Sequence, residues 1–360
     1  MSDPVHITLL PGDGVGPEVI GAARRVMDEA AAQAHLSIMW DEHVFGGAAI
    51  DTAGEPFPES TLAACASADA ILLGAIGGPA WDGVEPERRP EAGLLSLRKA
   101  LGAFANLRPI AVPSALAHLS VLPADSVAGT DMLVVRELTG GIYFGEPRSF
   151  TNEEAFDTMR YTRTEIERIV RVGFEQARLR SGRVTSLDKA NVLASSRLWR
   201  QVVTALHAED YADVALDHMY VDNAAMQIVR DPRSFDVILT ANLFGDILSD
   251  LASTLSGSLG VLPSASVGGL TPLFEPVHGS APDIAGHGVA NPVAAILSGA
   301  MLLDEVGHPA PAAAIRRAVD DTLSFGVMTV DLDPDGVSTE AFCDQVCSYL
   351  ARTAEASPSP

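Results

Sequence analysis

Hydrophobic and polar positions in the first 110 residues follow two periods in turn, which predicts alternating strands and helices. The apolar runs VHITLL (5–10), LSIMWDEHVF (36–45) and ADAILLGAI (68–76) predict strands. Apolar residues at helical spacing behind Pro17 predict a helix over 17–34, and a second helix is predicted over 94–104. Strands that alternate with helices are typical of a parallel sheet covered on both faces.

The pattern changes around residues 130–160. There DMLVVREL (131–138) and GIYFGEP (141–147) predict two closely spaced strands of an antiparallel or mixed element. Alternation then resumes, with helices predicted over 163–180 and 195–208 and strands over 183–189, 213–220 and 236–242. The last third of the chain is predicted to be helical. The predicted fold class is therefore α/β.

Charge and hydropathy exclude several classes of protein. The chain has 24 basic and 47 acidic side chains, a net charge of −23, so neither nucleic acid nor an anionic membrane surface is expected as a partner. A hydrophobic content of 47% excludes a disordered chain. The apolar stretch 292–303 is too short to cross a bilayer, and no basic region precedes the first strand, so a cytoplasmic protein is expected. The three cysteines show no metal-ligand spacing and are predicted to be packing residues.

Lysine is rare in this chain. Of the 24 basic residues only Lys99 and Lys189 are lysines. A lysine retained among arginines suggests a task that arginine cannot perform, such as losing its proton. Lys189, in SLDKANVL, is the candidate, although Lys99 shows that chance is an alternative explanation.

Two aspartates of NLFGDILSD are candidate metal ligands. Asp246 and Asp250 are four residues apart and share one face of a predicted helix, where two like charges repel unless a cation lies between them. Mg²⁺ and Mn²⁺ prefer such oxygen ligands. The alternative is an acidic first turn that complements the helix dipole.

Two glycine-containing loops are candidate nucleotide-binding segments. GDGVGPE (12–18) joins a strand to a helix, but its glycine spacing is not that of the Rossmann fingerprint, and a tight turn is the alternative. HGSAPDIAG (278–286) combines small residues with an aspartate that can accept hydrogen bonds from a ribose, or it is an ordinary polar loop. Arg98, Arg108 and Arg136 offer forks for carboxylates, or they form surface ion pairs.

Taken together, these segments resemble the isocitrate/isopropylmalate dehydrogenase family of β-decarboxylating dehydrogenases, in its isopropylmalate branch. The resemblance covers nearly the whole chain and rests on the following blocks: GDGVGPEV, GLLSLRK, NLRP, VVRELTGGIYFGEPR, DKANVL, DHMYVDNAAMQ, FGDILSD, LFEPVHGSAPDIAG and ANPVAAIL. It implies two α/β domains with a large mixed sheet shared between them, distinct from the Rossmann fold. The implied first domain is 1–103 with 257–360, which holds most of the cofactor site. The implied second domain is 104–256, which carries dimerisation, metal and substrate residues.

The resemblance also implies a role for each matching position. Arg98, Arg108 and Arg136 would bind the substrate carboxylates, and the isopropyl group would be accepted by Glu91, Leu94, Leu95 and Val192. Mg²⁺ or Mn²⁺ would be bound by Asp246 and Asp250 of one subunit and Asp222 of its partner in a homodimer. Lys189, also of the partner, would remove the hydroxyl proton, and Tyr143 would supply a proton at the end. The residues implied for NAD are Val15, Glu275, His278, Gly279, Ser280, Ala281, Pro282, Asp283, Ile284, Asn291 and Asp331.

The implied activity is the NAD-dependent oxidative decarboxylation of 3-isopropylmalate in leucine biosynthesis. The pair Leu94 and Leu95 suits a branched alkyl group, whereas isocitrate enzymes use a polar contact there. Asp283 and Ile284 resemble the form that prefers NAD, because a carboxylate repels the 2′-phosphate of NADP. An apolar pocket discriminates by only about 1–3 kcal/mol per methylene, so some activity on related malates is expected.

Overall fold

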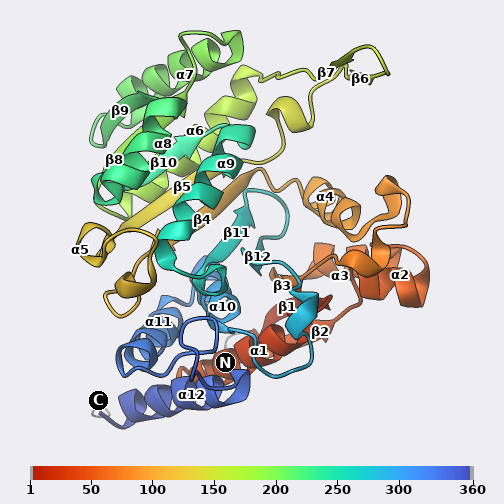
Figure 1. Cartoon of the computed structure of the whole chain (residues 1–360), viewed down its shortest axis with the longest axis vertical. Helices are drawn as coiled ribbons and strands as arrows, with labels where there is room; N and C mark the ends of the chain where they lie inside the picture. Colours follow the sequence, from red (N-terminus) through yellow and green to blue (C-terminus); the bar gives the residue numbers. More distant parts are fainter. Residues whose placement is uncertain (1–2, 357–360) are drawn as a thin grey trace. The chain divides into compact units, whose positions relative to one another are not determined.

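The computed structural model describes residues 3–356, and the chain divides into two compact units (Figure 1). The first unit comprises the described residues within Met1–Ala103, Ser114–Leu119 and Gly257–Pro360. The second unit comprises Phe104–Pro113 and Ser120–Ser256. The first unit is therefore built from both ends of the chain. The segment Ser114–Leu119 belongs to the first unit, whereas the predicted second domain was continuous over 104–256.

The first unit contributes five strands to the large mixed sheet, in the order β2-β1-β3-β12-β11. Their bounds are β1 Val5–Gly12, β2 Ile38–Glu42, β3 Ala70–Ala75, β11 Pro263–Val267 and β12 Leu273–Pro276. β1 runs parallel to β2 and β3, and β12 runs parallel to β3 but antiparallel to β11. Every residue of β3 is buried, as expected for a strand covered on both faces.

The helices of the first unit include four that pack together, α1, α10, α11 and α12, in the lower part of Figure 1. The bounds are α1 Gly16–Gln33, α2 Gly47–Ala53, α3 Glu59–Ser67, α4 Pro90–Leu101, α10 Val293–Glu305, α11 Pro309–Ser324 and α12 Thr339–Ala356. Short 3₁₀ turns are η1 Pro79–Trp81, η2 Pro86–Arg88, η3 Ala117–Leu119, η7 Leu259–Val261 and η8 Pro282–Ile284. A core cluster of this unit joins α3, α4 and the strands through Leu10, Phe45, Cys65, Ile71, Leu73, Leu97, Leu101 and Leu273.

The second unit contributes five strands to the mixed sheet, in the order β4-β5-β10-β8-β9. The bounds are β4 Ala105–Ala111, β5 Asp131–Glu137, β8 Arg183–Asp188, β9 Ala215–Tyr220 and β10 Val237–Thr240. Only β4 runs antiparallel to its neighbour, β5. A separate hairpin is formed by β6 Ser149–Phe150 and β7 Ala155–Phe156.

Five helices and three 3₁₀ turns complete the described part of the second unit: α5 Ala124–Val127, α6 Arg163–Arg178, α7 Ala194–Asp210, α8 Val221–Arg230, α9 Asn242–Ser253, η4 Gly141–Tyr143, η5 Pro232–Ser234 and η6 Thr254–Ser256. The start of α6 is fixed by a capping box between Thr162 and Glu165. The core of this unit includes Phe174 and Trp199, and Trp199 packs edge-on against Tyr161.

The predicted α/β class is confirmed, but two local predictions are wrong. GIYFGEP is not a strand: Gly141 has a φ of +76° and begins η4, and a Cβ at that position would lie 2.4 Å from Tyr161 Oη. This glycine therefore allows a tight turn against a buried tyrosine. The last third is not wholly helical, since β11 and β12 lie within it. The sequence of β11, PSASV, is completely buried, but its serines hide the apolar pattern that marks other strands.

The three cysteines are free thiols, and Cys65 and Cys343 are buried, as their predicted packing role requires. Within residues 3–356, no helix combines the length and apolar character needed to cross a membrane.

Candidate functional site

One cluster of predicted site residues lies around α9 in the second unit. Tyr143, at the end of η4, donates a hydrogen bond from Oη to Asp246 Oδ2 at 2.8 Å. Arg136 of β5 forms an ion pair with the same carboxylate through Nη1. Arg108 of β4 contacts Asp250 Oδ1 at 3.0 Å and lies 3.9 Å from Asp246 Oδ1. The structure therefore brings together two arginines, two aspartates and a tyrosine from four separate segments.

Arg136 is held in this cluster by Asn242, the first residue of α9. The Asn242 Oδ1 atom accepts hydrogen bonds from Arg136 Nε at 3.1 Å and Nη2 at 2.8 Å. Its Nδ2 atom donates to the backbone oxygens of Leu138 and Gly140, each at 3.1 Å. Gly245 leaves the space that Arg136 fills, because a Cβ there would lie 2.7 Å from Arg136 Cγ. Asn242 was not predicted as a site residue, since its contacts link distant parts of the sequence.

Arg108 is oriented in a similar way. Its Nε atom donates to Asn106 Oδ1 at 2.9 Å, and Nη1 donates to Ser249 Oγ at 2.7 Å. A guanidinium held on one side by neutral acceptors presents its remaining donors in a fixed direction. Arg108 and Arg136 therefore form a rigid cationic surface next to the aspartates.

The pKa of the Tyr143 phenol is raised, first by burial and then by its hydrogen bond to Asp246 and the charge of that carboxylate. A tyrosine hydroxyl is protonated at neutral pH, and the upward shift of its pKa leaves it so. Tyr143 can therefore act as a proton donor beside the two arginines.

A second cluster in the same unit contains Lys189 and Asp222. The Lys189 Nζ atom lies 2.8 Å from Asp222 Oδ1, and this contact lowers the pKa of the Asp222 carboxyl. Lys189 directly follows β8, and Asp222 lies in the first turn of α8. Val192 follows in the same loop as Lys189, with its side chain 63% exposed.

The acidic residues predicted to bind a metal do not form a complete site within the described chain. Among residues 3–356, no group of three or more His, Cys, Asp or Glu side chains is placed to hold a metal ion. Asp246 and Asp250 nevertheless provide two carboxylates one helical turn apart, and Asp250 is 68% exposed. Hard oxygen donors of this kind fit Mg²⁺ or Mn²⁺, with further ligands needed to complete the shell.

The third predicted arginine lies in the first unit, on α4. Arg98 Nη2 contacts Glu275 Oε1 of β12 at 2.5 Å, and both side chains are largely buried. On the same helix Leu94 packs against the core cluster, whereas Leu95 is 51% exposed. The Glu91 carboxylate lies beside Gly77, where a Cβ would come within 2.4 Å of its Oε1 atom.

The two predicted nucleotide-binding loops touch each other in the first unit. Val15 N donates to Ser280 O at 2.8 Å, and Gly14, with a φ of +58°, approaches so closely that a Cβ would lie 2.0 Å from the same oxygen. Ala281 also has a positive φ, of 38°, which is unusual for a residue with a side chain. The loop from His278 to Ile284 therefore has a fixed backbone conformation against the glycine turn.

Three further predicted cofactor residues, Asn291, Asp331 and His278, also belong to the first unit. Asn291 Nδ2 donates to Asp331 Oδ2 at 3.0 Å, and Ser258 Oγ donates to the same atom at 2.6 Å. His278 Nδ1 lies 2.9 Å from Gly279 O, and burial lowers the pKa of its imidazole. A neutral ring therefore donates from Nδ1 to the loop backbone.

Asp13 is a residue of this region that was not predicted. Its buried carboxylate accepts backbone hydrogen bonds from Gly47 at 2.8 Å, Ala48 at 2.7 Å and Gly77 at 2.7 Å. It therefore connects the glycine turn to the start of α2 and to the loop after β3. An acidic residue between two glycines was the available signal.

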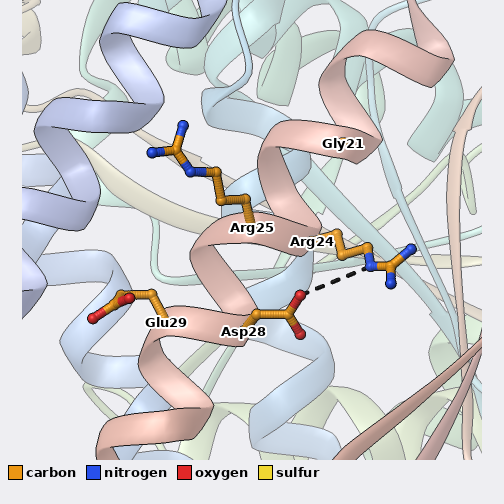
Figure 2. Close-up of a pocket in the computed structure, with 5 residues that line it drawn as sticks. All are labelled: Gly21, Arg24, Arg25, Asp28 and Glu29. Atoms are coloured by element: carbon orange, nitrogen blue, oxygen red, sulfur yellow. Dashed lines mark ion pairs between the residues drawn. The ribbon is translucent and has the colours of Figure 1, made fainter.

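A depression on the outer face of α1 is unrelated to these clusters (Figure 2). It is lined by Gly21, Arg24, Arg25, Asp28 and Glu29. Arg24 pairs with Asp28 at 3.8 Å, and Arg25 pairs with Asp344 of α12 at 2.6 Å. Its arginines are thus paired with acidic neighbours, and it contains none of the predicted site residues.

Comparison with known proteins identifies the class. The sequence profile of the isocitrate/isopropylmalate dehydrogenase family matches residues 6–346, and the chain belongs to this family. It is 60% identical to the 3-isopropylmalate dehydrogenase of Salinibacter ruber, over 96% of this chain and 95% of that protein. It is 56% identical to the protein of the same name from Shouchella clausii, over 96% and 97% of the two chains.

Solved structures agree with this assignment. The isocitrate dehydrogenase from Methylococcus capsulatus superposes with a TM-score of 0.84 and is 35% identical, over 96% of this chain and 99% of that one. A β-decarboxylating dehydrogenase from Thermococcus kodakarensis, in its apo form, gives a TM-score of 0.83 at 37% identity, over 99% and 100% of the two chains.

Proposed function

We propose that this chain catalyses the NAD-dependent oxidative decarboxylation of 3-isopropylmalate to 4-methyl-2-oxopentanoate, a step of leucine biosynthesis. The proposal rests on one cluster of side chains, formed by Arg108, Arg136, Tyr143, Asp246 and Asp250. It is supported by the 60% identity of the chain to a protein named 3-isopropylmalate dehydrogenase. The enzyme is proposed to act in the cytoplasm.

The guanidiniums are proposed to bind the substrate carboxylates. Arg108 and Arg136 already contact carboxylates, those of Asp250 and Asp246, and guanidiniums of this kind bind carboxylates well. Arg98 is proposed to act in the same way, in exchange for its contact with Glu275. Leu94, Leu95 and Val192 are proposed to contact the isopropyl group, with Glu91 at the edge of this pocket, and the exposed Leu95 and Val192 are available for that contact.

Proton transfers are assigned to two residues. Lys189 is proposed to take the proton of the substrate hydroxyl, since lysine, unlike arginine, can exist as a neutral base. Tyr143, whose hydroxyl is protonated at neutral pH, is proposed to donate a proton to the carbon that has lost CO₂. The two residues thus act at opposite ends of the reaction.

Asp246 and Asp250, with Asp222, are proposed to hold Mg²⁺ or Mn²⁺, and NAD is proposed to bind along Val15, Glu275, the loop 278–284, Asn291 and Asp331. When bound, the cation would supply Lewis-acid stabilisation of negative charge on substrate oxygen, and NAD would supply the hydride acceptor. The fixed contact between Val15 and Ser280 supports a preformed cofactor surface.

A homodimer with shared sites is proposed as the working state. The described chain holds no complete group of three acidic ligands, and Asp222 is engaged with Lys189 in a cluster separate from Asp246. Lys189 and Asp222 of the partner subunit would complete the site formed around α9. Each dimer would then contain two sites, each made from two chains.

The proposed function is tested by measuring NADH formation with Mg²⁺ and a set of 2-hydroxy acids. We expect the highest kcat/KM with 3-isopropylmalate, lower values with D-malate, tartrate and homoisocitrate, and loss of activity with EDTA that Mg²⁺ or Mn²⁺ restores. A higher kcat/KM with any of the other acids would contradict the substrate assignment. Full activity in EDTA would contradict the metal assignment.

A further inference from the structure

Lys189 and Asp222 occupy the ends of two neighbouring strands. β8 and β9 are parallel, and their last paired residues are Asp188 and Tyr220. Lys189 comes one residue after this pair on one strand, and Asp222 two residues after it on the other. The distance between the lysine and the carboxylate therefore depends on how firmly the two strand ends are held together.

One side chain of α7 contacts both strand ends. Arg200 donates from Nε to Asp188 Oδ2 at 2.8 Å and from Nη2 to Asp188 Oδ1 at 3.0 Å. The same guanidinium lies over the ring of Tyr220, 5.0 Å from its centroid. A planar fork can bind a carboxylate with its edge and stack on an aromatic ring with its face at the same time.

The surroundings of Arg200 make this contact rigid. Asp188 is 1% exposed, and its Oδ1 atom also accepts a hydrogen bond from Ala190 N at 2.8 Å, which closes the backbone turn around Lys189. The neighbouring Trp199 is buried and donates to Ser186 Oγ at 3.2 Å, which fixes this part of α7 on β8. Leaving a buried carboxylate without its cationic partner costs a large amount of free energy. The buried position of the Asp188 carboxylate therefore requires its ion pair with Arg200.

We propose that Arg200 is a positioning residue, which sets the placement of Lys189 relative to Asp222 and thereby the efficiency of the reaction. This inference rests on the proposed function, in which Lys189 is the base. Arg200 does not contact Lys189 in any described bond; it acts through Asp188 and Tyr220. Because misplacement of a catalytic group by about 1 Å can cost about 100-fold in rate, the effect belongs mainly to kcat.

The chain contains a matched control for this arrangement. Arg178 donates from Nε to Asp213 Oδ2 at 2.9 Å and from Nη2 to Asp213 Oδ1 at 2.7 Å, and it lies 4.5 Å from the centroid of Tyr211. The same three residue types thus meet near the beginning of β9, whereas Arg200 acts at its end. Arg178→Ala removes a contact between the same residue types, at an exposed carboxylate, without touching the strand ends that carry Lys189 and Asp222.

The first measurement needs no substrate. Since Lys99 and Lys189 are the only lysines, ¹³C labelling of lysine Cε gives two NMR signals, which Lys99→Arg assigns. We expect Arg200→Ala and Arg200→Lys to shift the Lys189 signal and leave that of Lys99 in place. Arg178→Ala is expected to shift neither. An unchanged Lys189 signal in folded Arg200→Ala would overturn the proposal.

The second measurement is the kinetics of the same variants. We expect kcat of Arg200→Ala with 3-isopropylmalate to fall about 10- to 100-fold, with KM for NAD within about twofold, because the proposed cofactor residues all lie in the first unit. Added methylguanidinium is expected to restore part of kcat. Arg200→Lys, which keeps the charge but not the fork, decides the question if Arg200→Ala does not fold.

These measurements distinguish a failure of the positioning role from a failure of the proposed function. A kcat within twofold of wild type in a folded Arg200 variant would overturn the positioning role. Wild-type enzyme that fails to turn over 3-isopropylmalate would contradict the proposed function instead, and the Lys189 signal would still report whether Arg200 places that lysine.

Discussion

The hydroxyl of Tyr143 donates to Asp246 at 2.8 Å, so a proposed proton donor and a proposed metal ligand are in direct contact. The guanidinium of Arg136 pairs with the same carboxylate and lies 5.9 Å from the centroid of the Tyr143 ring. The orientation of the phenol is thus set by one charged pair.

Tyr143→Phe tests the role of this hydroxyl. The ring and its contact with Arg136 remain, while the proton donor is lost, so kcat is expected to fall by about 100- to 10,000-fold. The measurement is NADH and CO₂ release under saturating substrate. Tyr211→Phe, which removes a hydroxyl elsewhere in the unit, serves as the control and is expected to keep kcat within about twofold. Equal kcat values for the two variants would exclude Tyr143 as a general acid.

Mixing two inactive variants tests the shared site. Asp222→Asn and Asp250→Asn are each expected to be almost inactive as homodimers. In a mixed dimer one site carries both changes and the other carries neither, so random reassociation is expected to restore about a quarter of wild-type activity. Mass spectrometry of the intact complex verifies that mixed dimers have formed. Mixed dimers without activity would place both aspartates in the same chain's site.

Asp283→Asn tests the choice of cofactor. The carboxylate of Asp283 favours ribose hydroxyls and repels the 2′-phosphate of NADP, so its neutralisation is expected to raise the ratio of kcat/KM for NADP to that for NAD by about tenfold. Asp304→Asn, on α10, is the control for a general change in charge. An unchanged ratio would show that Asp283 does not face the ribose.

His278 gives a prediction for the pH dependence of stability. Burial lowers the pKa of its imidazole below the ordinary value of 6.5, so the unfolded chain binds a proton that the folded chain does not. The free energy of unfolding should therefore fall as the pH drops below about 6.5, by at most about 1.4 kcal/mol per pH unit. His278→Gln is expected to reduce this slope in denaturant titrations at pH 5 to 7, whereas His118→Gln, at an exposed position, should leave it unchanged. Parallel slopes for wild type and His278→Gln would contradict the assignment.

Elements with local, regular hydrophobic patterns are predictable from the sequence. The strand over 5–10 and the helix over 17–34 are observed as β1 Val5–Gly12 and α1 Gly16–Gln33, because their apolar periods are regular and Pro17 marks the helix start. GIYFGEP was misread as a strand because its aromatic residues favour strands. The conformation there is instead determined by Gly141 and by Tyr161, twenty residues later.

The residues that position the site were harder to predict than the residues that form it. Asp246, Asp250 and Lys189 stand out by type or spacing, and their motifs carry the family resemblance. Three positioning residues instead act through hydrogen bonds to other segments of the chain: Asn242, Asp13 and Arg200, the last of which bonds to Asp188. Apart from the glycines on either side of Asp13, their immediate sequence gives no sign of those partners, so the folded chain is needed to identify them.

The two-part composition of the first unit has a consequence for synthesis on the ribosome. β3 pairs with β12, so the sheet begun by the first 103 residues can be completed only after residues beyond 257 have emerged. At about 5–20 residues per second, that delay is roughly 10 to 30 s. During this interval the edge of β3 that later pairs with β12 has no native neighbour. Most of the second unit has by then been synthesised and can fold. The nascent chain should therefore expose an apolar strand edge for several seconds. We expect a chaperone to bind the chain at this stage.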